Sequence, residues 1–223
     1  MRKILVTGAT GGIGRAICAE LAADTHLLVA GRNPQAVNEL VASLPAARPF
    51  VADLLDEAAI EAACQNFTEL DGLVLNAGIG FAKPVAATSH AEWLEMMLVN
   101  VVSAADLTRL LLPALRRSRG QVVAINSGAG FNAGPGWAAY SASKFAFRAF
   151  ADSLREEERA HIRVTSVHPG RVDTQMQVDL QASFGKPYNP AEHLRPESVA
   201  KTVRAALDAS PEACIETLSI RPW

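Results

Sequence analysis

Hydrophobic residues along the chain fall into short continuous runs, separated by longer stretches in which they recur with helical periodicity. The short runs predict seven strands, at 3–7, 26–30, 50–52, 72–75, 121–126, 162–167 and 213–220. The periodic stretches predict helices at 12–23, 35–44, 56–67, 89–117, 137–160 and 196–209. We expect Asp56 to cap the third helix, Pro196 to lie in the first turn of the last, and Pro113 to kink or end the long fourth helix.

The predicted strands lack the alternation of a half-exposed sheet, so both faces of the sheet should be covered. Strands that alternate with helices, joined by right-handed crossovers, predict a doubly wound α/β (Rossmann) fold with a parallel seven-stranded sheet and helices on both faces. A length of 223 residues suits one domain, 1–223. The stretch at about 171–195 has weak periodicity, and a loop of that length is expected to be functional, so we assign it as a substrate loop.

Composition excludes several function classes. A net charge of -2 argues against nucleic acid as a partner. No segment has the ~18 uninterrupted apolar residues of a membrane span, and the apolar run after Arg2 and Lys3 is too short for a signal peptide. The cysteines Cys18, Cys64 and Cys214 lie far apart, which predicts reduced thiols in a cytoplasmic protein with no metal site.

A glycine-rich turn follows the first predicted strand directly, with Gly8, Gly12 and Gly14 before the first helix. Glycines let the backbone approach a pyrophosphate closely, and the helix N-terminus offers free N–H groups and partial positive charge. The spacing Gly-x3-Gly-x-Gly differs from the more familiar Gly-x-Gly-x2-Gly. The turn therefore predicts a dinucleotide site, the alternative being a turn that binds nothing.

A second group combines a tyrosine, a lysine and a serine. Tyr140 and Lys144 are four residues apart, so they share one face of the predicted helix. Ser127 ends the fifth predicted strand, thirteen residues before the tyrosine. A nearby ammonium should lower the phenol pKa from about 10, and the serine hydroxyl could stabilise charge on a substrate oxygen. The group predicts proton transfer at such an oxygen; the alternative is an amphipathic pair on a buried helix.

Further motifs follow in order along most of the chain: Asn76-Ala77-Gly78 after the fourth strand, Asn100 in the next helix, and Pro169-Gly170 with Thr174 after the sixth strand. With the glycine turn and Tyr140-x3-Lys144, this series resembles the short-chain dehydrogenase/reductase family. The resemblance implies hydride transfer between a nicotinamide and a carbonyl or secondary alcohol. It implies four catalytic residues, namely Asn100, Ser127, Tyr140 and Lys144, with Asn100 holding a water against the lysine.

The same resemblance implies the cofactor-binding residues, in which Lys144 bonds the nicotinamide ribose and Asn76 supports the adenine pocket. The expected set is Gly8, Thr10, Gly12, Ile13, Gly14, Arg32, Asp53, Asn76, Ala77, Gly78, Tyr140, Lys144, Pro169, Gly170 and Thr174. Asp53 is expected either to bond the adenine ring or to cap a turn.

Arg32 bears on which dinucleotide binds. It follows the second predicted strand, where NAD enzymes usually carry an acid that accepts from the ribose 2′-OH. A guanidinium can instead bind a 2′-phosphate, so we predict NADP (NADPH), with NAD less favoured. The alternative is a solvated surface arginine. Gly11 stands where some NADP-dependent members have a basic residue, so that support is missing.

Three loops should form the substrate wall. They are 80–88 with Phe81, 128–139 with Phe131, Asn132 and Trp137, and 171–195 with Met176, Phe184 and Tyr188. We predict a small apolar or aromatic carbonyl or secondary alcohol as substrate, unless these aromatic side chains pack elsewhere. His168 is expected to be a hydrogen-bonded strand-end histidine rather than a second acid, and Asn126 to point to the face opposite Ser127.

Two other functions stay open. One is an NADP(H)-sensing binding protein that has lost catalysis, although sensors often lack the tyrosine or lysine. The other is a nucleotide-sugar epimerase or dehydratase, which typically carries a larger C-terminal region than this chain has after its last predicted strand. The resemblance also implies a homodimer or homotetramer paired through 89–117 and 137–160. Six apolar residues there could serve either the core or that interface: Trp93, Met96, Met97, Phe145, Phe147 and Phe150.

Overall fold

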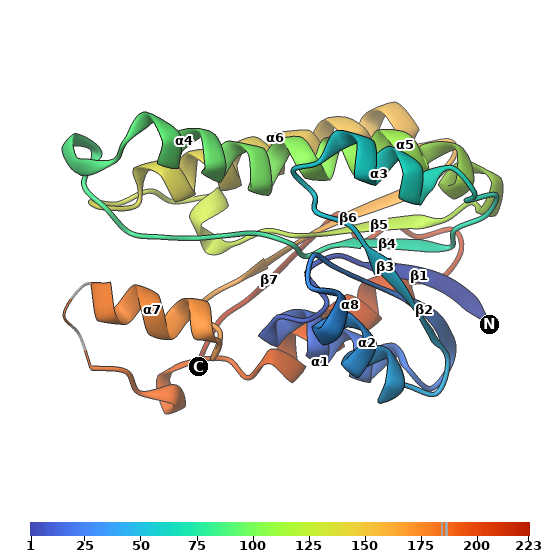
Figure 1. Cartoon of the computed structure of the whole chain (residues 1–223), viewed down its shortest axis with the longest axis horizontal. Coiled ribbons are helices and arrows are strands. Elements are labelled where there is room, and N and C mark those ends of the chain that lie inside the picture. Colours follow the sequence, from blue (N-terminus) through green and yellow to red (C-terminus); the bar gives the residue numbers. More distant parts are fainter. Residues whose placement is uncertain (184, 186) are drawn as a thin grey trace.

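A parallel sheet in the order β3-β2-β1-β4-β5-β6-β7 forms the centre of the molecule (Figure 1). The computed structural model describes residues 1–183, 185 and 187–223. The strands are β1 (Arg2–Val6), β2 (Thr25–Gly31), β3 (Ala47–Val51), β4 (Gly72–Leu75), β5 (Gln121–Ile125), β6 (Arg163–Pro169) and β7 (Thr217–Ile220). Every neighbouring pair is parallel, which confirms the predicted fold class.

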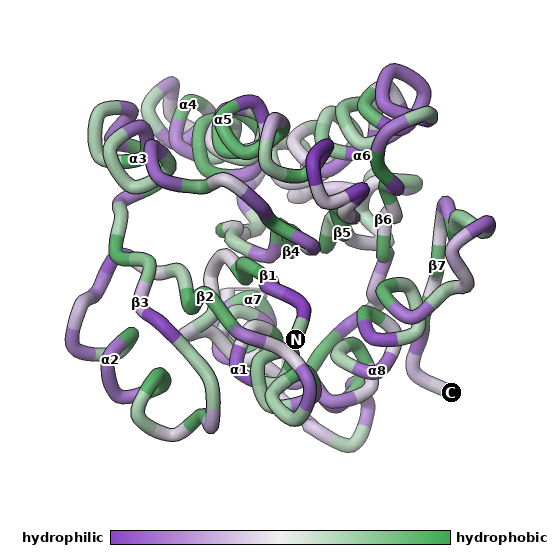
Figure 2. The backbone as a smooth tube through the Cα atoms, turned by 90° about the vertical axis from the view of Figure 1, so that its right-hand side faces the viewer, coloured by the Kyte–Doolittle hydropathy of each residue, from purple (hydrophilic) through white to green (hydrophobic). Residues whose placement is uncertain are grey.

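Helices cover both faces of this sheet. They are α1 (Gly12–Leu21), α2 (Pro34–Ala42), α3 (Glu57–Cys64), α4 (His90–Met97), α5 (Ser103–Ser118), α6 (Ala138–Glu158), α7 (Gln175–Ser183) and α8 (Pro196–Leu207). Helices α3 to α6 form the upper layer and α1, α2 and α8 the lower one, with the sheet between them (Figures 1 and 2). Two apolar clusters fill the two interfaces, one around Leu73 and Leu111 above the sheet and one around Ile17 and Val203 below it.

Side-chain caps set several helix starts. Asn33 accepts a hydrogen bond from the Ala36 amide at 3.2 Å and begins α2. Asp56 accepts from the Ala59 amide at 3.0 Å, which confirms its predicted role as the cap of α3. Ser89 and Glu92 form a reciprocal capping box at the start of α4. Each cap satisfies amides that would otherwise lack a partner, and so fixes where its helix begins.

The long predicted helix at 89–117 departs from expectation. It is interrupted at a π-helical turn, Leu98–Val102, and Pro113 lies inside a continuous α5. Leu111 and Leu115, on either side of the proline, are fully buried, and their packing holds the helix together where one backbone hydrogen bond is lost. The π turn places Asn100, 1% exposed, at the interruption.

Two other boundaries differ for physical reasons. The predicted loop 171–195 contains α7, in which only Leu180 is buried among the described residues, so the segment has no strong apolar stripe. The third strand begins at Ala47 rather than 50 and contains Pro49. A proline lacks the N–H of a ladder, and β3 tolerates one because it lies at the edge of the sheet.

The run His90–Ser118 is long and apolar enough to cross a membrane, by length and composition alone. Its apolar residues have a packing role in this structure. Leu107, Leu111 and Leu115 are fully buried in the cluster above the sheet. The core thus accounts for the apolar residues on one side of this run, whereas Leu94, Leu98 and Val102 are exposed.

The chain reverses its direction of travel across the sheet between β1 and β4. It moves from β1 outward to β2 and β3, then returns to β4 and proceeds the other way to β7. Parallel strands end at the same edge, so a crevice opens beyond the carboxyl ends of β1 and β4. The predicted site residues follow these strand ends.

Candidate active site

The glycine turn after β1 is packed too closely for side chains. Gly8 has φ +58°, in the region that favours glycine. A Cβ at Gly14 would stand 2.2 Å from the Gly8 carbonyl oxygen, and one at Gly12 would stand 2.9 Å from Cγ2 of Thr174. The turn therefore needs glycine at these positions, and Thr174 lies directly against it.

Asn76 ties the end of β4 to this turn. Its Nδ2 donates to the carbonyl oxygens of Thr7 at 3.0 Å and Gly8 at 3.1 Å. The amides of Asn76 and Ala77 both donate to Oγ1 of Thr7 at 2.9 Å. Asn76 thus fixes the two strand ends that border the crevice.

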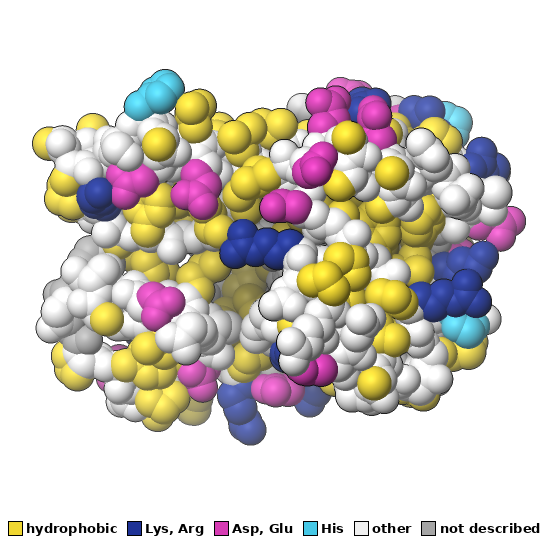
Figure 3. All heavy atoms as spheres, in the orientation of Figure 1, with side chains coloured by type: hydrophobic (Ala, Val, Ile, Leu, Met, Phe, Trp, Pro, Cys, Tyr) yellow, Lys and Arg dark blue, Asp and Glu magenta, His cyan; other side chains and the backbone are white. Residues whose placement is uncertain are grey.

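A groove of about 510 Å³ runs beside the turn. Ten of the predicted cofactor-binding residues line it: Gly8, Thr10, Gly12, Ile13, Arg32, Asp53, Asn76, Ala77, Gly78 and Thr174. Glu95 of α4 and Met176 of α7 also line it, and Figure 3 shows this face hollowed between the upper helical layer and the layer that contains α7. The shape and lining fit a dinucleotide whose pyrophosphate lies at the N-terminus of α1.

Arg32 and Asp53 sit at the outer part of the groove. Arg32 is exposed, directly after β2. Asp53 Oδ1 accepts from the Leu55 amide at 3.0 Å, so it caps a turn while it also lines the groove. Both of its expected roles are therefore compatible with its position.

A second cavity, of about 470 Å³, adjoins the groove and shares Ile13, Thr174 and Met176 with it. Ser127, Tyr140, Pro169 and Gly170 line this cavity. A hydrogen bond joins the Tyr140 and Ser127 side chains. The structure thus places the predicted proton-transfer pair beside the inner end of the groove.

Lys144 and Asn100 lie behind this pair. Lys144 is buried, its Nζ is 5.8 Å from the Tyr140 ring centroid, and it donates to the Ile125 carbonyl at 3.3 Å. Asn100 Oδ1 accepts from the Ile79 amide at 2.8 Å, and its Nδ2 donates to the Ile79 carbonyl at 2.9 Å and to Ser143 Oγ at 2.9 Å. A Cβ at Gly78 would lie 3.1 Å from Asn100 Oδ1 and 3.7 Å from Lys144 Nζ, so both side chains converge on Gly78.

The pKa of Tyr140 is shifted in the direction opposite to the one expected from the sequence. Burial raises the pKa of Tyr140, and the hydrogen bond from Ser127 only partly opposes that effect. Burial also lowers the pKa of Lys144 to about 8. The expected lowering of the tyrosine pKa is wrong for this structure, because desolvation of the phenolate is the larger effect.

Several expected wall residues pack elsewhere. The Phe131 ring packs against the His168 ring with centroids 4.2 Å apart and the planes tilted by 38°, and Tyr188 donates to Asp173. Neither these two aromatic residues nor Phe81 lines the second cavity, whereas Asn132, Trp137 and Met176 do. Phe184 lies outside the described residues.

His168 and Asn126 both support Ser127. His168 is fully buried, with Nδ1 3.0 Å from the Ser127 carbonyl oxygen and Nε2 2.9 Å from Ser166 Oγ, which confirms a hydrogen-bonded strand-end histidine. Asn126 Oδ1 accepts from the Ser127 amide at 2.9 Å, and the residue lines the second cavity. The expectation that Asn126 faces away is wrong, because strand alternation ends at β5, one residue earlier.

Two arginines also line this cavity: Arg171, the first residue of the predicted substrate loop, and Arg221, which sequence reasoning missed. Arg221 directly follows β7, which pairs with β6, and β6 ends in Pro169. The position of Arg221 directly after the last predicted strand was therefore the one signal in the sequence that could have placed it at this cavity.

A doubly wound sheet with a glycine turn, a dinucleotide-sized groove and a serine–tyrosine–lysine group defines a class of dinucleotide-dependent oxidoreductases. Comparison with known proteins agrees. The model of the short chain dehydrogenase family matches residues 2–183. The chain belongs to the short-chain dehydrogenase/reductase family, whose members act on CH–OH and C=O groups.

Individual relatives give the extent of the similarity. The chain is 37% identical over 227 residues to Dehydrogenase/reductase SDR family member 7B of Bos taurus, with 92% of this chain and 70% of the relative covered. An alcohol dehydrogenase from Thermococcus sibiricus, solved with 5-hydroxy-NADP, has a TM-score of 0.91 at 26% identity and covers 100% of this chain and 97% of its own. A closed form of serine dehydrogenase complexed with NADP+ has a TM-score of 0.88 at 26% identity, covering 98% and 94%.

Proposed function

We propose that this protein is an NADP-dependent oxidoreductase that transfers a hydride between nicotinamide and a small carbonyl or secondary alcohol, with Tyr140 as the proton donor or acceptor. The observation that supports it most is the pairing of Tyr140 with Ser127 in a cavity that adjoins the dinucleotide groove. Apolar walls from Trp137, Met176 and Leu180 suit the hydrocarbon part of such a substrate.

The proton chemistry follows from the side chains. When bound, the cofactor supplies the hydride to the carbonyl carbon in reduction, or accepts it in oxidation. In reduction, the Ser127 hydroxyl donates a hydrogen bond to the carbonyl oxygen and orients it. Tyr140 gives its proton to the same oxygen, so one carbonyl, one NADPH and one proton give one alcohol and one NADP+.

Lys144 and Asn100 support that step. The Lys144 ammonium stabilises the phenolate that Tyr140 becomes. Its pKa of about 8 also lets it exchange a proton near neutral pH. Asn100 positions the Gly78–Ile79 backbone beside the lysine, and we propose that it also holds the water that completes the proton path.

Arg32 and the relatives support NADP as the cofactor. Arg32 lines the groove directly after β2, and the residues on either side of it, Gly31 and Asn33, are uncharged. A guanidinium there suits a 2′-phosphate. Both solved relatives described above are complexes with NADP or a derivative of it.

A panel of ketones, aldehydes and secondary alcohols, assayed with NADPH and NADP+ at the nicotinamide absorbance, tests the proposal. We expect turnover of at least one carbonyl, and a loss of about 1,000-fold in kcat for Tyr140→Phe with NADPH affinity unchanged. A folded, NADPH-binding protein that reduces no carbonyl would instead be the sensing protein. Retained turnover in Tyr140→Phe would contradict the role of the phenol.

We further propose a homo-oligomer in the cytoplasm. Leu94, Leu98 and Val102 recur at four-residue intervals along α4 and the π turn and are 49%, 42% and 51% exposed. Phe145 of α6 is also exposed, whereas Met96 and Phe147 belong to the core. A monomer by light scattering would contradict the oligomer.

The three free cysteines support a reducing compartment, which localisation of a tagged chain tests.

A further inference from the structure

The walls of the second cavity carry positive charge, contributed by two arginines. Arg171 and Arg221 both line the cavity, and its lining includes no aspartate or glutamate among the residues that the structure describes. The remaining polar walls are uncharged side chains such as Asn132 and Gln177. The charge of this cavity is therefore decided by how the two arginines are paired.

Arg171 has a carboxylate partner. Its Nη1 is 3.9 Å from Glu192, and the two side chains are 51% and 59% exposed. Such an exposed pair is weak, but Glu192 offsets the charge of Arg171.

Arg221 is held by carbonyl groups only. Its Nη1 donates to the carbonyl oxygens of His168, in β6, and of Ile220, in β7 at 2.9 Å. No carboxylate forms an ion pair with it in the part of the chain that the structure describes. Carbonyl oxygens fix the orientation of a guanidinium but do not cancel its charge, so Arg221 keeps a full positive charge at the cavity wall.

Two glycines make room for this side chain. A Cβ at Gly128 would stand 3.3 Å from Arg221 Nη2, and one at Gly170 would stand 3.1 Å from Arg221 Cδ. Gly128 is the residue after Ser127, whose side chain hydrogen-bonds Tyr140. The guanidinium therefore lies next to the backbone that carries the serine.

We propose that Arg221 binds a carboxylate on the substrate, so that the protein acts on oxo acids and hydroxy acids. This inference rests on the proposed function: Ser127 and Tyr140 hold the reacting oxygen, and the carboxylate lies one or two carbon atoms away along the chain of the substrate. The edge of one guanidinium matches the two oxygens of a planar carboxylate. Arg221 takes no part in the hydride or proton transfer, so the balance of the reaction is unchanged.

The test compares each of several 2-oxo and 3-oxo acids with its own primary amide, for example 3-oxobutanoate with 3-oxobutanamide. The wild type should reduce the acid with a kcat/KM roughly 10- to 100-fold above that of the amide in at least one pair. In Arg221→Gln that preference should disappear, because the rate on the acid falls by more than the rate on its amide. Arg221→Lys keeps the positive charge and should therefore retain part of the preference for the acid over its amide.

Two variants serve as controls. Arg48→Gln makes the same charge change at an exposed residue of β3, at the opposite edge of the sheet from β7, and should leave the preference intact. Arg171→Gln should have a smaller effect than Arg221→Gln because Glu192 already pairs with Arg171. A larger effect for Arg171→Gln would overturn the assignment to Arg221.

Other outcomes separate this inference from the proposed function. If neutral carbonyls are reduced but no acid is preferred over its amide, the carboxylate site is wrong and the oxidoreductase stands. If Arg221→Gln lowers the rates on acid and amide equally, Arg221 has only a structural role. If a folded, NADPH-binding protein reduces neither acids nor neutral carbonyls, the proposed function fails and this inference fails with it.

Discussion

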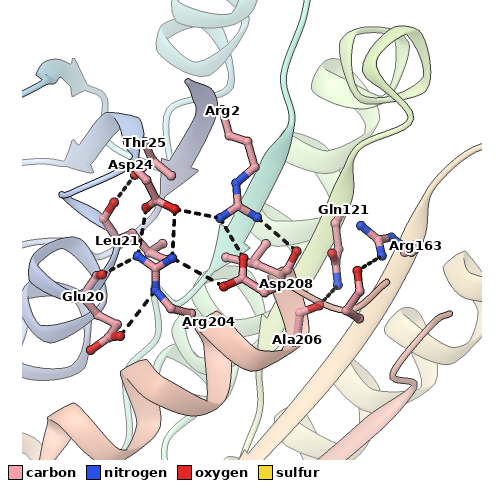
Figure 4. A network of polar contacts seen from close by, with 12 residues as sticks. Arg2, Glu20, Leu21, Asp24, Thr25, Gln121, Arg163, Arg204, Ala206 and Asp208 are labelled. Atoms are coloured by element: carbon pink, nitrogen blue, oxygen red, sulfur yellow. Dashed lines mark hydrogen bonds and ion pairs between the residues drawn. The ribbon is translucent and has the colours of Figure 1, made fainter. Parts of the chain in front are cut away.

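The two ends of the sheet treat charged side chains in opposite ways. At the amino end, Arg2 and Arg204 meet Asp24 and Asp208 in one network (Figure 4). At the carboxyl end, Arg32 and Arg221 line the groove and the cavity without an ion-pair partner among the residues that the structure describes. The amino-end charges are balanced within the protein, whereas Arg32 and Arg221 remain available to a ligand, although Arg171 at the same end pairs with Glu192.

The amino-end network joins the helices below the sheet to β1. Arg204 of α8 holds Asp24 through two hydrogen bonds of 2.9 and 3.1 Å, and Arg2 of β1 lies 2.8 Å from Asp208. The hydrogen bond from Arg204 is the main reason why the pKa of Asp24 is lowered. Residues of this kind stabilise a fold, whereas unpaired charges and desolvated groups in a cavity indicate a functional site.

Backbone packing at the carboxyl end should give the largest effect. Gly14→Ala places a Cβ 2.2 Å from the Gly8 carbonyl oxygen, so the turn must move. We expect a loss of about 3 kcal/mol in the free energy of unfolding, measured by denaturant titration, together with loss of NADPH binding. Gly11→Ala is the matched control, because a Cβ there would meet only the Gly8 oxygen at 3.4 Å, and it should cost less than about 1 kcal/mol. Equal losses for the two variants would contradict this account of the turn.

The buried ammonium of Lys144 should lower the free energy of unfolding at neutral pH. Its pKa in the folded state is about 8, below the unfolded value of about 10.4, so the unfolded chain binds more protons between these values. Stability should therefore rise with pH in that window. Relative to Lys144→Met, the wild type should gain about 2 kcal/mol between pH 7 and pH 9.5, measured by denaturant titration of both proteins. A constant difference across that range would show that burial does not perturb the lysine.

The elements that depend on a local sequence pattern were predicted correctly. The apolar run at β4 and the cap at Asp56 are both local signals, and the structure has them as predicted. The glycine turn after β1 was visible for the same reason. α7 was not predicted because only Leu180 is buried among its described residues, which leaves no stripe for a pattern to report.

Contacts between distant segments escaped prediction. Arg221 enters the cavity only because β7 pairs with β6, fifty-three residues from His168, whose carbonyl it bonds. The hydrogen bonds between the Asn100 side chain and the Ile79 backbone likewise join residues twenty-one positions apart. None of these depends on residue spacing within one element, so periodicity could not show them.

Arg32 tests the unpaired charge of the groove. Arg32→Asp removes a cation that forms no ion pair with any described residue, so stability should be unchanged within about 0.5 kcal/mol. The kcat/KM with NADPH should fall roughly 100-fold as the contact to the 2′-phosphate is lost and the new acid repels it. Comparable wild-type kcat/KM with NADH and NADPH, or an unchanged value for the variant with NADPH, would contradict the assignment of Arg32.

Substitution of Arg204 should have the smallest effect, and the reverse of that expected for Arg32: a small loss of stability with activity unchanged. Arg204→Met removes the centre of the amino-end network, which includes Asp24 and Asp208. The partner carboxylates are 51% and 44% exposed, so water can solvate them, and the loss should be about 1 kcal/mol, smaller at high salt. Turnover and NADPH affinity should stay within about twofold of wild type, because the network lies at the end of the sheet away from both cavities. A variant that melts normally but loses activity would show that the amino end also serves the site, and the contrast between the two ends would then fail.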